Sequence, residues 1–258
     1  MTATRQIVCG MALVFLAATT CHAAIYDFTA GPSAIQGWQP YEPLVPFGVS
    51  YAFTDNPDGY RIQSGPSVNP ALLGPARVGS FLPGSMSDFG LSFDVPSYSS
   101  SPSEFLGAAA RMGTVGLGTT SGYALGYDNV GGGLFMEKIV NEASAGPIGP
   151  VAFAPVALTP GQGYRFTFEG IGSTFDGAVY SLNNLATPLA TVSGVDSQFS
   201  SGQVGLLVAS EASAGAADAT FSRFTIVPEP AALSLLALGG LALLRRQKAQ
   251  GFSPTGRI

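Results

Sequence analysis

The chain has 258 residues and a net charge of −5, and only 10% of its residues are charged, while 34 are glycines and 19 are prolines. Both cysteines, Cys9 and Cys21, and the only histidine, His22, lie near the N-terminus. The rest of the chain therefore excludes disulfides, thiol nucleophiles, Ser-His-Asp triads and zinc or iron sites built on imidazole.

The N-terminal segment has the pattern of a secretory signal peptide. Arg5 precedes an apolar stretch over residues 7–18, and small residues follow at Ala23 and Ala24. A basic start, a short apolar run and small residues at a cleavage point are typical of exported proteins. We expect export through the Sec translocon and cleavage after Ala23, with Ala24 as the alternative. A lipoprotein anchored at Cys21 is a further alternative.

The body, from Ala24 to about Pro230, is long enough for one domain with a substantial core. All 16 acidic residues of the chain lie in it, against six basic ones, so its net charge is −10. A body this acidic repels nucleic acid and anionic lipid, and we expect no nucleic-acid partner. The six basic residues are Arg61, Arg77, Arg111, Lys138, Arg165 and Arg223.

The body is predicted to be all-β. Residues 91–95 and 164–169 alternate apolar and polar side chains, which is typical of half-buried strands. Similar short segments recur between turn signals, and no long stretch has helical periodicity. About a dozen strands without helices predict two packed antiparallel sheets, a β-sandwich or jelly roll over residues 24–226. The other expected strands are 49–53, 60–62, 76–81, 105–112, 123–127, 134–140, 178–182, 189–192, 204–208 and 219–227. The turn signals are Asp58-Gly59, Pro160-Gly161 and Asp176-Gly177.

The order of several segments in the second half resembles the closing strands of concanavalin A-like, or laminin-G-like, jelly rolls. The resemblance covers residues 89–227, and another sandwich topology is the alternative. It implies a fold in which many members bind glycans or proteins, some bind calcium, and some are hydrolases or lyases. The segments that carry it are residues 122–127, 158–166, 176–180, 201–206 and 221–226.

Two candidate binding sites stand out in the body. Trp38 and Tyr41 lie among prolines and could form an exposed aromatic platform for a glycan, or could be buried at an edge of the core. Asp128 and Asn129 precede three glycines in a loop that could hold calcium, with Asp218 converging from elsewhere. The alternative for this pair is an Asx turn that leads into a hairpin.

A carbohydrate hydrolase of this fold would use clustered carboxylates as nucleophile and acid. Glu137 and Glu142 are separated by an expected strand end, so we predict that they do not share a strand face and are solvated surface groups. A glycosidase needs a converging pair of carboxylates. The sequence therefore predicts a protein that is not an enzyme, with a carboxylate-based carbohydrate-active enzyme as an alternative.

The C-terminal segment has the pattern of a membrane anchor. It reads Val227-Pro228-Glu229-Pro230, then an apolar run over residues 231–244, then Arg245 and Arg246. The prolines keep the first part extended. The run spans about 21 Å as a helix, and its basic flank can extend that span by snorkelling. Because the basic residues follow it, the end of the chain is expected to stay cytoplasmic.

This order of elements resembles the PEP-CTERM sorting signal of Gram-negative bacteria, over residues 227–248. The resemblance implies that Pro228, Glu229 and Pro230 are recognised by an exosortase, a membrane transpeptidase. It implies that residues 231–244 form a transient transmembrane helix, that Arg245 and Arg246 stop it, and that residues 249–258 are a cytoplasmic tail. Such signals are associated with exopolysaccharide and biofilm.

The sequence thus predicts an exported protein that is first held in the inner membrane and then reaches the cell envelope or the extracellular matrix. Its expected role is non-catalytic, as a cell-surface or matrix component that could contact exopolysaccharide. A calcium-dependent, lectin-like glycan-binding module is the first alternative, and calcium is the one cofactor that the sequence allows.

Overall fold

The structure, a computed structural model, describes residues 23–99, 104–210 and 216–228. The predicted signal peptide up to residue 22 lies outside these residues, as does the predicted sorting signal from Glu229 onward, including Arg245 and Arg246. Within the described ranges, no helix has both the length and the apolar character needed to span a membrane.

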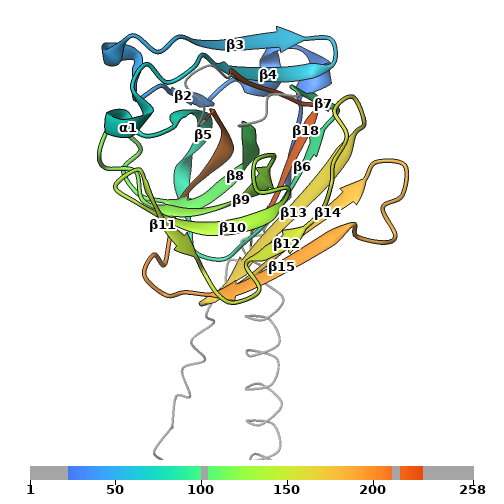
Figure 1. The fold of residues 1–258 in the computed structure, drawn as a ribbon. Coiled ribbons are helices and arrows are strands. Elements are labelled where there is room, and N and C mark those ends of the chain that lie inside the picture. Colours follow the sequence, from blue (N-terminus) through green and yellow to red (C-terminus); the bar gives the residue numbers. More distant parts are fainter. Residues whose placement is uncertain (1–22, 100–103, 211–215, 229–258) are drawn as a thin grey trace, which may run out of the picture. The chain divides into compact units, whose positions relative to one another are not determined.

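Antiparallel strands form three sheets in the body (Figure 1). The six-stranded sheet has the order β1 (Ala24–Asp27), β18 (Arg223–Pro228), β6 (Phe89–Val95), β13 (Tyr164–Ile171), β14 (Thr174–Ser181) and β15 (Ala190–Val195). The eight-stranded sheet has the order β11 (Ala143–Pro147), β10 (Gly133–Val140), β9 (Gly122–Asp128), β8 (Glu104–Met112), β16 (Gly202–Ser210), β5 (Ala76–Met86) and β2 (Gln39–Tyr41), and β12 (Phe153–Pro155) also pairs with β10.

A smaller four-stranded sheet was not expected from the sequence. It has the order β3 (Tyr51–Asn56), β4 (Gly59–Ser64), β17 (Ala217–Phe221) and β7 (Ser97–Tyr98). Its apolar side chains, among them Ile62 and Phe221, join the main core cluster. The described helices are short: α1 (Pro70–Leu73) and the 3-10 turns η1 (Phe28–Ala30), η2 (Pro32–Ile35) and η3 (Val45–Phe47).

The main core lies between the six-stranded and the eight-stranded sheets. Along β13 the buried side chains alternate with partly exposed or exposed ones, and Phe166 stacks on Phe93 of β6 with ring centroids 5.0 Å apart. From the opposite sheet, Tyr123 and Leu125 of β9 join the same cluster, while Ala124 between them belongs to a second cluster on the other face. Strand β9 is therefore buried on both faces, which explains why its sequence is almost wholly apolar.

Two sequence predictions fail where tertiary packing decides the local structure. Asp176-Gly177 lies inside β14 and does not form a turn. Glycine is required at position 177 because an added Cβ would come within 2.1 Å of Leu125 in the facing sheet. The glycine thus serves close packing, and the turn falls at Gly172 instead. The strand expected over 219–227 is two strands in different sheets, separated at Ser222, whose N–H donates to the carbonyl of Asp94.

A buried arginine joins the turns of the two large sheets at one edge of the core. The Arg111 side chain is only 1% exposed and lies against the rings of Phe89 and Phe175. Its guanidinium donates to three backbone carbonyls and forms an ion pair with Asp88 at 3.1 Å. The carbonyls belong to Ser87, Gly172 and Phe199, at 2.6, 2.7 and 3.3 Å.

Replacing this arginine by methionine is expected to destabilise the body strongly. Arg111→Met leaves three carbonyls without their side-chain donor and the Asp88 carboxylate without its cation, although the N–H of Gly172 still donates to it. Breaking a buried ion pair from one side costs about 3–5 kcal/mol. Urea unfolding monitored by tryptophan fluorescence measures the loss. The matched control is Arg61→Met, which breaks an ion pair with Asp218 that is more exposed; pairs at the surface contribute about 0–1 kcal/mol. Equal losses in the two variants would contradict the role given to Arg111.

Candidate functional site

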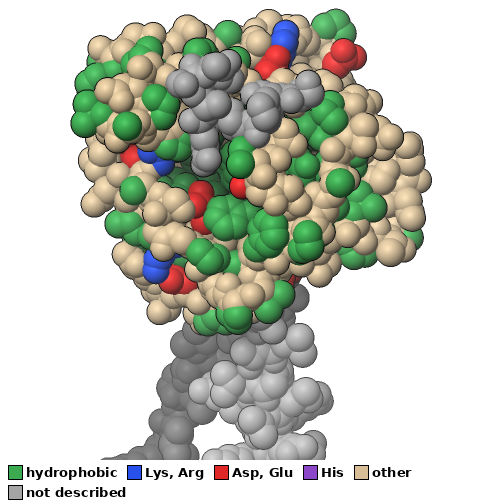
Figure 2. Space-filling view, viewed as in Figure 1, with side chains coloured by type: hydrophobic (Ala, Val, Ile, Leu, Met, Phe, Trp, Pro, Cys, Tyr) green, Lys and Arg blue, Asp and Glu red, His purple; other side chains and the backbone are tan. Residues whose placement is uncertain are grey.

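A hollow of about 590 Å³ lies on the outer face of the eight-stranded sheet, the face turned away from the main core. Figure 2 shows this face recessed, with apolar, acidic and basic side chains around the recess. Its lining comes from β5, β8, β9, β10, β11, β16 and the segment around α1. A preformed concavity of this size with mixed apolar and polar walls is the usual form of a small-ligand site.

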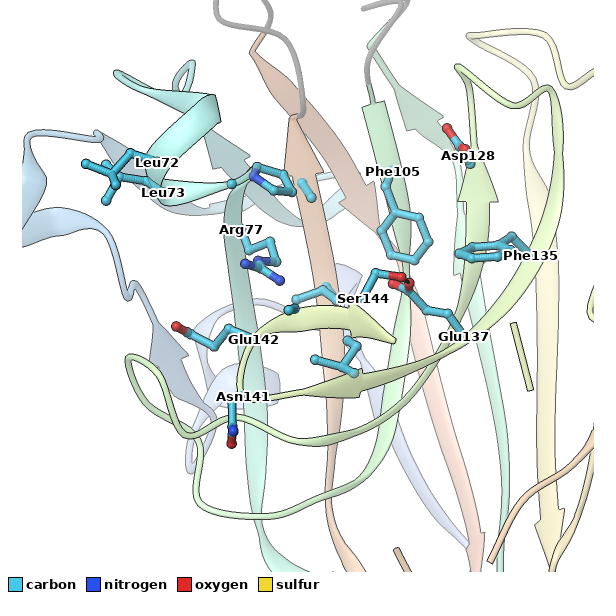
Figure 3. A pocket seen from close by; sticks show the side chains of 16 residues that line it. Leu72, Leu73, Arg77, Phe105, Asp128, Phe135, Glu137, Asn141, Glu142 and Ser144 are labelled. Atoms are coloured by element: carbon cyan, nitrogen blue, oxygen red, sulfur yellow. Dashed lines mark hydrogen bonds between the residues drawn. The ribbon is translucent and has the colours of Figure 1, made fainter. Parts of the chain in front are cut away.

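Aromatic rings on the outer face of the sheet lie against glycines of neighbouring strands, and two of these rings line the hollow. The ring of Phe105 covers Gly126, where an added Cβ would come within 2.7 Å of its Cζ atom. In the same way, the ring of Phe153 covers Gly133, at 2.5 Å from such a Cβ. Between them, Phe135 pairs across the strands with Gly126 on one side and Phe153 on the other. Phe105 and Phe135 line the hollow, and their rings lie near each other in Figure 3.

A tight turn brings Glu142 to the wall of the hollow. Asn141 and Glu142 have φ values of 50° and 68°, and Val140 pairs with Ala143, so they form the two-residue hairpin turn between β10 and β11. A left-handed φ at two successive positions is typical of a type I′ turn, where glycine is usual at the second. Glu142 is nevertheless held there, because its carboxylate accepts hydrogen bonds from the Tyr41 hydroxyl and from the N–H of Gly118 at 2.6 Å.

Tyr41 and Glu142 form a buried polar pair at the side of the hollow. Their side chains are 5% and 8% exposed. Burial, and then the hydrogen bond to the Glu142 carboxylate, raises the pKa of Tyr41 well above its usual value, so the hydroxyl remains a donor. The pair therefore fixes the β10–β11 turn against β2, at the opposite edge of the sheet.

The remaining polar groups of the hollow come from β5, β10 and β11. The hydroxyl of Ser144 donates to the carboxylate of Glu137, across the β10–β11 hairpin. Arg77 extends from β5 into the hollow and faces these two residues and the phenylalanine rings (Figure 3). With aromatic rings, fixed oxygens and a guanidinium in its lining, the hollow can bind a ligand that has an apolar face and several hydroxyl or carboxylate groups.

The sequence prediction for Glu137 and Glu142 is correct about the strand end between them, because β10 ends at Val140, but it is wrong about the surroundings of Glu142. Both side chains line the same hollow, and Glu142 is buried instead of being a solvated surface group. The reason is the type I′ turn, which folds the residues after β10 back across its outer face. The sequence does not predict this turn, because both of its central residues, Asn141 and Glu142, are residues other than glycine.

The aromatic platform predicted at Trp38 and Tyr41 is not exposed. Trp38 packs edge-on against Tyr26, Phe28 and Phe224 in the main core and is 8% exposed. Tyr41 is buried beside Phe81. The neighbouring prolines suggested a loop, but residues 39–41 form β2, in which Gln39 and Pro40 are exposed and Tyr41 is buried. The buried-edge alternative therefore describes both residues.

The residues of the predicted calcium site form the alternative, an Asx turn. The Asp128 carboxylate accepts a hydrogen bond from the N–H of Val130 at 2.8 Å, at the start of the β9–β10 hairpin. Asn129 is adjacent, whereas Asp218 lies on β17 and pairs with Arg61. Among the described residues, no three acidic, cysteine or histidine side chains gather as metal ligands. Calcium at Asp128 and Asn129 stays a prediction.

The first two residues of the predicted sorting motif belong to the folded body. Val227 and Pro228 are the last residues of β18 and pair with Gly90 and Phe89 of β6. Ala24, the alternative cleavage residue, is the first residue of β1, and Ala23 directly precedes it. The rest of the motif and the membrane stop lie outside the described residues.

Comparisons with known proteins find no family model and no curated protein that matches the chain. Solved structures do match its fold. The carbohydrate-binding module CBM66 from Bacillus subtilis is 19% identical, with a TM-score of 0.51 over 72% of this chain and 92% of that one. Lectin II from Ulex europaeus is 8% identical, with a TM-score of 0.54 over 81% and 99%. The GH43 protein BlXynB from Bacillus licheniformis is 13% identical, with a TM-score of 0.50 over 79% of this chain but 39% of that one.

At these identities the likeness establishes the fold alone. The body is an all-β antiparallel sandwich of the concanavalin A-like, lectin-like type. This confirms the fold class predicted from the sequence, with the four-stranded sheet as an addition.

Removing the Tyr41 hydroxyl is expected to destabilise the wall of the hollow. Tyr41→Phe leaves one oxygen of the buried Glu142 carboxylate without its donor, which costs about 1–3 kcal/mol. Thermal unfolding measured by circular dichroism reports the loss. Tyr180→Phe is the matched control, because the Tyr180 hydroxyl has no hydrogen bond to any residue that the structure describes. A Tyr41→Phe variant as stable as this control would contradict the pairing.

Proposed function

We propose that the body is an exported glycan-binding module, and that a carbohydrate binds in the hollow on the outer face of the eight-stranded sheet. The observation that carries this proposal is the floor of the hollow, where Phe105 and Phe135 lie beside fixed polar side chains. Sugars present apolar C–H faces together with hydroxyl groups, so an aromatic ring next to anchored oxygens complements both.

The polar groups of the hollow suit binding better than turnover. Both oxygens of Glu142 accept hydrogen bonds from the protein, and Glu137 accepts one from Ser144. Such anchored carboxylates are oriented hydrogen-bond acceptors for sugar hydroxyls. The likeness of the fold to a carbohydrate-binding module and to a lectin supports the same conclusion, and the protein is proposed to be non-catalytic.

Export and sorting complete the proposed function. The signal-peptide pattern that ends at Ala23 supports transport through the Sec translocon. The tail from Val227 to Arg246 supports anchoring in the inner membrane, recognition by an exosortase and delivery to the cell envelope or extracellular matrix. At that location the hollow would contact exopolysaccharide.

Shortening either phenylalanine of the floor is expected to weaken glycan binding. Phe105→Ala and Phe135→Ala each lower the affinity about two- to tenfold, because an aromatic contact contributes about 0.5–1.5 kcal/mol. A glycan array identifies the ligand, and isothermal titration calorimetry measures the affinities, with and without calcium chelation. Ile171→Ala, which removes an exposed apolar side chain from β13, is the control. Equal affinities in the three variants would remove the hollow as the site.

Changing the tail motif is expected to block processing. Glu229→Ala or Pro230→Ala removes the element assigned to the exosortase, so that the unprocessed precursor accumulates in the membrane fraction. Immunoblots of fractionated cells, together with the intact mass of the released protein, measure this. Glu169→Ala, at an exposed glutamate of β13, controls for loss of a negative charge. Normal release of both tail variants would contradict the sorting role.

A further inference from the structure

The basic side chains of the body differ in whether they have an acidic partner. Arg61, Arg111, Lys138 and Arg165 each form an ion pair with an aspartate at 3.1 Å or less. Arg223 forms no ion pair with any described residue, but it is exposed on β18 and lies opposite Asp27 in the β1–β18 pairing. Arg77, in contrast, lines the hollow and has neither an ion pair nor a hydrogen bond to any residue in the described ranges. In a body that carries sixteen acidic residues, a cation without a partner is unusual, and this one lies inside the hollow.

The position of Arg77 keeps its guanidinium available. In the strand register, Arg77 of β5 pairs with Ala209 of β16, and Ala209 pairs with Phe105 of β8. Because Ala209 is small, no bulky side chain separates the guanidinium from the phenylalanine ring on this face. Beside it, at the end of α1, is Gly74, where an added Cβ would lie 3.5 Å from the Nη2 atom.

The carboxylates that line the hollow already have donors. Glu142 accepts from Tyr41 and Gly118, and Asp128 accepts from Val130. Glu137 accepts from Ser144. Of the charged groups that line the hollow, Arg77 is thus the one that lacks a counter-group among the residues that the structure describes. The planar guanidinium of Arg77 can donate two parallel hydrogen bonds to one carboxylate.

We propose that the hollow selects a glycan containing a uronic acid, whose carboxylate pairs with Arg77 while the sugar ring lies against Phe105 and Phe135. This inference rests on the proposed function and names the class of sugar. A neutral sugar would fill the same space but would leave the guanidinium partly desolvated and unpaired, which is unfavourable. The body's charge of −10 disfavours unspecific attraction of a polyanion, so selection has to come from a local contact.

The test compares polygalacturonate with its fully methyl-esterified form, which has the same sugar backbone without the negative charge. Affinity electrophoresis with the full chain in detergent measures binding of Arg77→Gln, Arg77→Lys and the wild type. Arg77→Gln is expected to lower the affinity for the acid form at least tenfold and to change that for the ester by less than twofold. Arg77→Lys keeps the positive charge but cannot donate two parallel hydrogen bonds, so its affinity for the acid form is expected to lie between those of Arg77→Gln and the wild type. Arg61→Gln, on β4, is the control for charge and should match the wild type.

The outcomes separate this inference from the function on which it rests. If the ester binds as tightly as the acid, or if Arg77→Gln leaves the acid's affinity unchanged, the selection of uronic acids is overturned while a glycan site dependent on Phe105 can stand. If dextran sulfate competes as well as polygalacturonate, charge alone is recognised and the inference also fails. If the wild type binds no glycan, both the inference and the proposed function fall.

Discussion

Arg111 is the contact on which the two large sheets depend for their mutual position. One side chain from β8, in the eight-stranded sheet, binds carbonyls in the turns that follow β5, β13 and β15. A buried guanidinium is stable only if its donors and charge are satisfied, so these turns cannot move apart without leaving it unpaired. Because β8 also carries Phe105, the same contact fixes the strand at the centre of the hollow.

The hollow follows from how this sheet is packed on its two faces. The inner face packs against the six-stranded sheet, whereas the outer face combines small residues such as Ala109 and Ala124 with larger ones such as Leu207 and Ile139. The rings of Phe105 and Phe153 can approach the backbone closely where glycine occupies the neighbouring strand. The β10–β11 turn and the segment around α1 form the walls of the hollow. The carboxylates of Glu142 and Glu137 on this side accept hydrogen bonds from Gly118 and Ser144.

The sequence predicts the all-β class and the central strands well, because alternation in segments such as 164–169 reflects burial on one face. It misses β1, β2, β7, β11 and β12, which are short and have no periodicity of their own. The site is harder to foresee. Glu142 reaches it through a turn made of non-glycine residues, and Tyr41 through pairing with the distant β5. Arg77 stands out only when the partners of the other basic residues are known, and a sequence does not give them.

The pairing of β1 with β18 has a kinetic consequence for folding as the chain emerges from the N-terminus. Ala24 and Ile226, at opposite ends of the body, are direct neighbours across these strands. Contacts between such distant segments form slowly, because the loop between them must close first. The first strand to emerge therefore has to wait for the last one. Until then an unpaired strand edge can pair with other chains, and a chaperone that covers this edge would prevent such pairing.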